Sequence, residues 1–200
     1  PRDEPILLYQ GGIQVGRGLE QLLEAVPAIE RGTVVLMGEG RLKSKIVRMV
    51  RERRLESRVR FAPRVPYLEL YHYTAHAFLG FQVIQNVCFN HYSTISNKLL
   101  EYIMAGVPAI VSDFPEMKRI VEKYGVGLCI DSSRPEAIAA AANRLLDDRD
   151  LYERCRSGCI RARQELNWEK EAGRFVALYR ELHLGDRTDI KEQANDPGYK

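Results

Sequence analysis

Short apolar runs alternate with amphipathic segments along most of this 200-residue chain. The apolar runs, which we predict to be strands, are Ile6 to Gln10, Thr33 to Met37, Val59 to Phe61, Ala77 to Gln82, Ala109 to Ser112 and Gly127 to Ile130. The segments between them, which we predict to be helices, are Leu19 to Ile29, Arg41 to Leu55, Tyr67 to Tyr73, Asn97 to Ala105 and Glu116 to Tyr124. This alternation predicts an α/β fold, a Rossmann-like doubly wound parallel sheet with helices on both faces.

Three further helices are predicted after the last strand, at Glu136 to Leu146, Leu151 to Leu166 and Trp168 to Leu182. Two helix starts have the pattern of a capping box, because Asp113 and Ser133 each lie three residues before a glutamate. Residues 185–200 are polar and show no apolar period. We therefore expect one domain over residues 1–184 and a disordered tail over 185–200.

The composition excludes some classes of protein. No apolar run approaches the roughly 20 residues of a membrane-spanning helix, and no signal segment precedes the first predicted strand. The four cysteines, Cys88, Cys129, Cys155 and Cys159, form no Cys-x-x-Cys pair. We expect a soluble cytoplasmic protein with reduced thiols and no metal site.

Basic residues are concentrated between Arg41 and Arg60, although the net charge of the chain is only +3. Leu42, Ile46 and Val50 follow a helical period through this run, so one side of the helix is apolar and the rest is charged. The charged side is either a solvated helix surface or a surface that attracts anionic lipid headgroups at a membrane or an acidic acceptor. Nucleic acid is not expected, because no aromatic residues are interleaved for stacking on bases.

The helix predicted at Asn97 to Ala105 has a polar start and stands directly before a buried strand. Ser96 is the expected N-cap, and the free N–H groups of the first turn, near Asn97, attract anions. Lys98 and Glu101 lie three residues apart on one side of this turn. A phosphate of a ligand could lie beside Lys98, and Glu101 could accept hydrogen bonds from hydroxyl groups of the same ligand. This combination suits a sugar nucleotide.

A glycine-rich turn follows the first predicted strand and contains Gly11, Gly12, Gly16, Arg17 and Gly18. It resembles a P-loop only superficially, since arginine stands in the place of lysine and glycine in the place of the Mg²⁺-binding serine or threonine. Backbone N–H groups and one guanidinium remain, which are sufficient to hold a diphosphate without a metal ion.

The segment Val83 to Ile95 has no clear period, and we expect a loop at the carboxyl end of the fourth strand, where open parallel sheets bind ligands. His91 in this loop is a candidate contact to a ligand. His72 and His76 are better explained by packing or solvation on a short aromatic helix. No Ser-His-Asp or Cys-His arrangement is evident from the spacing.

Four segments resemble, in order and spacing, the C-terminal donor-binding domain of the GT-B retaining glycosyltransferases, the glycosyl transferases group 1 or family 4. They are Leu8 to Gly18, Leu36 to Gly40, Ser96 to Asp113, and Asn167-Trp168 with Leu178-Tyr179. The resemblance implies metal-independent transfer of a hexose from a nucleoside-diphosphate sugar to an acceptor, with retention and without a cofactor, in polysaccharide or glycoconjugate biosynthesis. It also implies a missing N-terminal domain that holds the acceptor, so that this chain alone is expected to be inactive.

The resemblance also implies roles for individual residues. Arg17 and Lys98 are the expected catalytic residues, because they would stabilise the leaving diphosphate, and Glu101 would hold the ribose hydroxyls. The other expected substrate-binding residues are Gly12, Gly16, Gly18, Gly38, Ser96, Asn97 and Leu99. Ser93 stands where relatives usually carry a first glutamate that contacts the donor sugar, eight residues before Glu101.

Two other functions fit parts of the pattern. A sugar-nucleotide epimerase of related architecture would need catalytic carboxylates and histidines that the sequence does not place together. A non-catalytic domain that binds a sugar nucleotide or a partner protein is the second alternative. The sequence does not specify the base, the sugar, the acceptor or the linkage.

Overall fold

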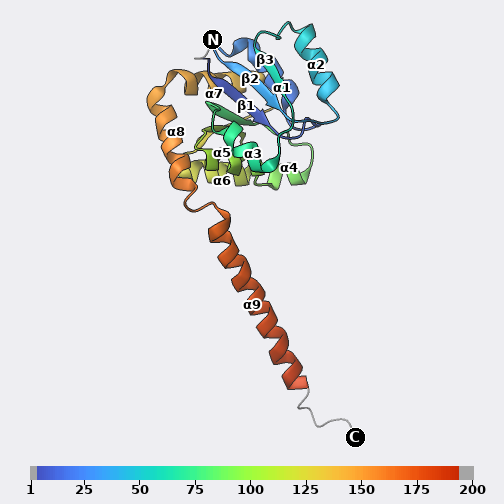
Figure 1. The fold of residues 1–200 in the computed structure, drawn as a ribbon, viewed down its shortest axis with the longest axis vertical. Helices are drawn as coiled ribbons and strands as arrows, with labels where there is room; N and C mark the ends of the chain where they lie inside the picture. Colours follow the sequence, from blue (N-terminus) through green and yellow to red (C-terminus); the bar gives the residue numbers. More distant parts are fainter. Residues whose placement is uncertain (1–3, 194–200) are drawn as a thin grey trace. The chain divides into compact units, whose positions relative to one another are not determined.

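The computed structural model describes residues 4–193. The chain divides into two compact units after Arg163, which is earlier than the boundary predicted after residue 184. The first unit contains the sheet and the helices that cover it, and the second contains the long helix α9, Trp168–Gln193 (Figure 1). Each unit is described separately below.

The six strands of the first unit are all parallel and form one sheet in the order β3-β2-β1-β4-β5-β6 (Figure 1). Their bounds are β1 Ile6–Gln10, β2 Thr33–Met37, β3 Val59–Ala62, β4 Leu79–Gln82, β5 Ala109–Ser112 and β6 Gly127–Ile130. This arrangement confirms the predicted doubly wound fold. The strand order reverses between β1 and β4, so the crevice between their carboxyl ends is where such sheets bind ligands.

The helices of the first unit join successive strands and then follow the last one. They are α1 Leu19–Ala25, the 3₁₀ helix η1 Val26–Ala28, α2 Lys43–Glu52, α3 Tyr67–Thr74, α4 Phe89–Ser93, α5 Asn97–Ala105, α6 Pro115–Tyr124, α7 Pro135–Asp147 and α8 Arg149–Ala162. Short helix α4 lies in the segment expected to be a loop. Its five residues are too few to show a helical period, so sequence periodicity could not predict it.

Helices cover both faces of the sheet. Leu7 and Tyr9 of β1 point to one face, where they join residues of α1, α2 and α7 in the main hydrophobic core. Tyr102 of α5 lies against Gly80 of β4, the register partner of Leu8, so α5 covers the opposite face. Because side chains alternate along a strand, Gln10 lies on the same face as α5.

The two predicted capping boxes are absent. Helices α6 and α7 begin at Pro115 and Pro135, and their N-cap residues make no side-chain cap hydrogen bond. Proline holds the preceding residue extended, which moves the start of each helix and leaves Asp113 and Ser133 one residue too early to cap. Asp113 instead pairs with Lys118 at 3.0 Å.

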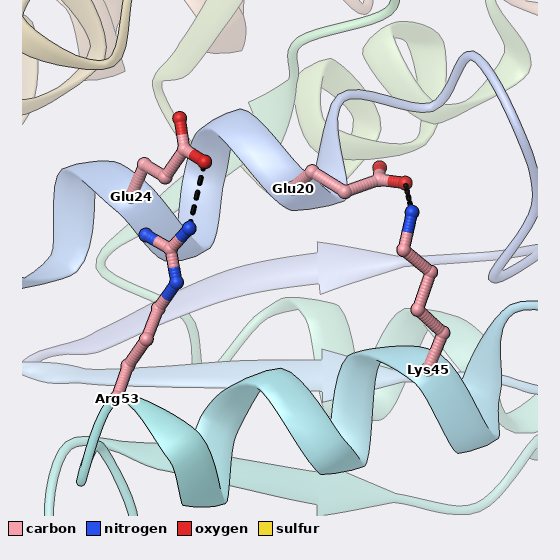
Figure 2. Close-up of polar contacts among 4 residues, drawn as sticks. All are labelled: Glu20, Glu24, Lys45 and Arg53. Carbon is pink, nitrogen blue, oxygen red and sulfur yellow. Dashed lines mark hydrogen bonds and ion pairs between the residues drawn. The ribbon is translucent and has the colours of Figure 1, made fainter.

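Most basic residues around α2 have partners within the domain. Lys45 pairs with Glu20 at 3.2 Å and Arg53 with Glu24 at 2.8 Å, which joins α2 to α1 (Figure 2). Arg58 donates hydrogen bonds to two backbone carbonyls. These contacts favour the solvated helix surface over a surface for lipid headgroups, because the cations are already paired at close range.

The second unit contains helix α9, which begins at Trp168, as the sequence predicted, and continues to Gln193. Residues 185–193 were expected in the tail but belong to this helix, and residues 194–200 of that tail lie outside the described residues. The rings of Trp168 and Phe175 are 6.4 Å apart along one side of α9. Within residues 4–193, no helix has the length and apolar content that a membrane crossing requires.

Candidate functional site

The glycine-rich turn after β1 packs against the turns that follow β2 and β4. The N–H of Gly11 donates to the carbonyl of Met37 at 2.9 Å, and the N–H of Gln85 donates to the carbonyl of Gly16 at 2.8 Å. Gly38 has φ +145°, and a Cβ there would lie 2.0 Å from the carbonyl oxygen of Gly11. Because Gly11, Gly16 and Gly38 have no side chains, the turns after β1, β2 and β4 can meet where the strand order reverses.

Helix α5 begins beside these turns with the predicted N-cap. The Ser96 side chain accepts a 3.3 Å hydrogen bond from the N–H of Lys98. Asn97 is exposed, whereas the side chain of Leu99 is fully buried in the fold. The first turn of α5 therefore presents Lys98 to the crevice, while Leu99 anchors the helix in the core.

Lys98 extends over the glycine-rich turn. A Cβ on Gly11 would lie 2.5 Å from Lys98 Cε, and Lys98 Nζ lies 5.5 Å from the centroid of the Tyr9 ring. The Tyr9 hydroxyl donates a 2.7 Å hydrogen bond to the carbonyl of Gly12. Burial and, to a lesser extent, the nearby charge of Arg17 lower the pKa of Lys98 to about 8, while the charge of Glu101 opposes both effects.

Glu101 lies one turn further along α5 and is half-buried. Its Oε2 accepts a 2.7 Å hydrogen bond from Nε2 of Gln10, the last residue of β1. Within residues 4–193, its Oε1 has no hydrogen-bond partner. The carboxylate is thus held on one oxygen while the other can accept from a ligand.

These groups surround a cavity of about 400 Å³ at the carboxyl edge of β1. The cavity is lined by Gln10, Gly11, Gly12, Gln14, Met37, Gly38, Glu39, Arg64, Val65, Tyr67, Leu70, Lys98 and Glu101. Of the residues predicted from the sequence, Gly12, Gly38, Lys98 and Glu101 line it. The lining combines cationic side chains, glycine backbone and carboxylates, which suits a ligand with both phosphate and hydroxyl groups.

A sequence model of the family described as glycosyl transferases group 1 matches residues 1–159. The chain belongs to this family. Alpha-D-kanosaminyltransferase from Streptomyces kanamyceticus is 24% identical over 190 residues, which are 91% of this chain and 47% of that protein. The chain therefore spans less than half the length of this curated relative.

Two solved structures show the fold of this group 1 chain within longer proteins. Sucrose-phosphate synthase from Thermosynechococcus elongatus superposes with a TM-score of 0.78 at 26% identity, over 92% of this chain and 47% of that one. HepE from Anabaena, in complex with UDP and glucose, superposes with a TM-score of 0.79 at 13% identity, over 90% of this chain and 49% of that one.

The remaining predicted residues of the group 1 chain lie around the cavity but do not line it. Arg17 is close enough for its charge to affect the pKa of both Tyr9 and Lys98. Gly16 and Gly18 pack against the loop after β4. Asn97 lines a neighbouring hollow of about 440 Å³ between α3 and α5, which shares Glu101 with the first.

The other polar candidates lie elsewhere. The Nδ1 of His91 lies 3.1 Å from the carbonyl oxygen of Gln85, and its ring packs against Gly16. His72 and His76 line a separate, mostly apolar hollow beside α3. Ser93, which stands where relatives have a glutamate, donates its hydroxyl to the carbonyl of Phe89 within α4. In residues 4–193, no three His, Cys, Asp or Glu side chains gather as a metal site would need.

Sequence reasoning missed the cavity residues that come from β1, from α3 and from the loop before it. Arg64, Val65 and Tyr67 follow β3 without any motif. Gln10 did carry a signal, because a polar residue ended an otherwise apolar strand. Tyr102 was also missed as a support: its buried hydroxyl lies 3.1 Å from the carbonyl oxygen of Leu8 and accepts from the N–H of Gln10, which fixes α5 on β1.

Proposed function

We propose that this chain is the donor-binding domain of a retaining, metal-independent glycosyltransferase that uses a nucleoside-diphosphate sugar. The observation that carries the proposal is the cavity at the switch point, where Lys98 and Glu101 of α5 face the glycine turns after β1 and β2. The family supports a transferase, and the complex of HepE with UDP and glucose supports a nucleotide donor in the same fold.

The proposed chemistry is electrostatic. Negative charge grows on the diphosphate as the bond to the sugar breaks, and preorganised positive groups stabilise that charge. Lys98 and Arg17 supply two cations, and the N-terminal end of α5 adds the positive end of a helix dipole. Glu101 accepts hydrogen bonds from the ribose hydroxyls. No step of this scheme uses a metal ion or a cofactor.

The acceptor and its binding groups belong, in this proposal, to a part of the protein outside this chain. Transfer requires donor and acceptor to be held together, so the chain alone is expected to bind the donor and not to transfer the sugar. We propose a hexosyltransferase of polysaccharide or glycoconjugate biosynthesis in the cytoplasm. The four cysteines, all free, fit a reducing compartment.

The proposal predicts that nucleoside diphosphates bind this chain more tightly than the free nucleosides do. Calorimetry with UDP, GDP, ADP and CDP and with their nucleosides measures this directly. Arg17→Ala should weaken diphosphate binding about tenfold or more, since hydrogen bonds to charged groups contribute roughly 1.5 to 3 kcal/mol. Binding should be equal in EDTA and in Mg²⁺.

Arg51→Ala is the control for this experiment, because Arg51 is an exposed arginine on α2 outside the cavity. The Arg51→Ala variant should bind the diphosphate as tightly as the wild type does. A diphosphate that binds only with Mg²⁺, or equal affinities for wild type and Arg17→Ala, would contradict the proposed mode of binding. Sugar transfer by this chain alone would contradict the proposal that a part of the protein outside this chain holds the acceptor.

Diphosphate affinity should also fall as pH rises through about 8. The pKa of Lys98 is lowered to about 8 in the free protein, so above this pH the amine is neutral. A bound diphosphate favours the ammonium, and binding then requires uptake of a proton. Lys98→Arg, which stays charged, should give a flatter profile of affinity against pH. Identical profiles for the two proteins would remove Lys98 from the diphosphate site.

A further inference from the structure

Gln10 is a buried polar residue at the edge of the cavity, with only 1% of its surface exposed. Its Nε2 donates to Oε2 of Glu101 at 2.7 Å, and its Oε1 accepts from the hydroxyl of Thr74 at 2.7 Å. Thr74 ends α3 and is itself fully buried. Gln10 therefore connects the end of β1 to α3 on one side and to α5 on the other.

The chemistry of the partners fixes the orientation of the Gln10 amide. An ionised carboxylate only accepts hydrogen bonds, so the amide nitrogen must face Glu101. The amide oxygen then faces the Thr74 hydroxyl, which also lies 2.9 Å from the carbonyl oxygen of Leu70. Rotation of the amide would lose the hydrogen bond to Glu101 and place the amide oxygen against a carboxylate oxygen, so the observed orientation is the one that holds Glu101.

A second glutamine shows that burial alone does not produce such contacts. Leu8 is the register partner of Gly80, and Gln10 and Gln82 each follow two residues later, so both lie on the face that α5 covers. Gln82 is fully buried, but neither its Nε2 nor its Oε1 has a partner among the described residues. The contacts of Gln10 are therefore particular to its position beside Thr74 and Glu101.

We propose that Gln10, supported by Thr74, is a positioning residue that holds the Glu101 carboxylate ready for the ribose of the nucleotide. This inference rests on the proposed function, because the ribose is assigned to Glu101 there. With Oε2 held by Gln10, Oε1 is left for a ribose hydroxyl. A carboxylate fixed before binding loses less rotational freedom when the ligand arrives, so Gln10 acts on selectivity for ribose rather than on the diphosphate.

The test compares UDP, GDP and ADP with their 2′,3′-dideoxy counterparts, using the base that binds the wild type most tightly. Gln10→Met keeps the length of the side chain and removes both hydrogen bonds, and it should lower the ratio of ribose to dideoxyribose affinity about three- to tenfold. Gln82→Met is the matched control and should leave the ratio unchanged. In a Glu101→Ala background, Gln10→Met should have no further effect on this ratio.

Thr74→Val and Thr74→Ser provide a second pair should Gln10→Met not fold. The valine variant should lower the ratio in the same direction, and the serine variant, which keeps the hydroxyl, should restore it. An unchanged ratio in folded Gln10→Met or Thr74→Val overturns the inference. A wild type that binds diphosphates without preferring ribose overturns it too, while leaving the diphosphate site intact. A wild type that binds no nucleotide overturns the proposed function as well.

Discussion

Gly18→Ala is expected to lower the free energy of unfolding by about 3 to 5 kcal/mol. Gly18 is the N-cap of α1 and has φ +72°, a conformation that costs an alanine roughly 1 to 2 kcal/mol. A Cβ there would also lie 1.8 Å from the carbonyl oxygen of Val83, which is backbone and cannot rotate away. The loops after β1 and β4 would have to separate at the crevice.

Gly106→Ala is the matched control, because Gly106 has the same φ of +72° and nothing within 4 Å of an added Cβ. It should lose only the roughly 1 to 2 kcal/mol of the left-handed conformation. Urea denaturation of the two variants measures the difference. Equal losses would mean that the loop after β4 does not approach Gly18 as the structure places it.

Lys98→Met is expected to change binding and stability in opposite directions. Diphosphate affinity should fall about tenfold or more, because an ammonium contact is removed. The free energy of unfolding without ligand should rise by about 1 to 2 kcal/mol at pH 7. Burial and the charge of Arg17 lower the pKa of Lys98 from 10.5 to about 8, so the charged form is destabilised in the folded protein. Partial exposure of the side chain reduces the expected gain.

The dependence on pH gives this prediction a second test. Between pH 8 and 10.5 the unfolded chain still binds the Lys98 proton and the folded chain does not, so this group makes the wild type more stable as pH rises. The advantage of Lys98→Met should be complete below pH 8 and disappear by about pH 10.5. Lys118→Met is the control, since Asp113 raises the pKa of this exposed lysine. It should give no gain in stability and no loss of affinity.

The alternation of strands and helices could be predicted from the sequence because strands and helices each have a characteristic local period of apolar residues. The bounds predicted for β1 and α5, Ile6–Gln10 and Asn97–Ala105, agree with the structure. The N-cap at Ser96 was also correct, because a cap depends on residues within one turn. Where local rules competed, the prediction was wrong: the prolines at 115 and 135 displaced both capping boxes.

The candidate site was predictable only in part. Gly12, Gly38, Lys98 and Glu101 belong to recognisable turns or to one helix turn, and all four line the cavity. Their mutual positions required the strand order, in which β1 neighbours β4 instead of β3. Residues without a local pattern, such as Arg64 and Tyr67, entered the site only because the loop after β3 reaches the same edge of the sheet.

The sequence by itself determined which segments are strands and helices, apart from the short helix α4, and which residues carry charge at the start of α5. Tertiary structure alone decided that Gln10 meets Glu101, which is 91 residues away, and that the side chain of Gln82, on the same face, meets no polar partner among the described residues. Local periods depend on neighbours a few residues apart, so a single sequence displays them. A hydrogen bond between distant elements depends on sheet register, helix packing and the absence of a side chain at Gly38 and Gly80, and these exist only once the chain has folded.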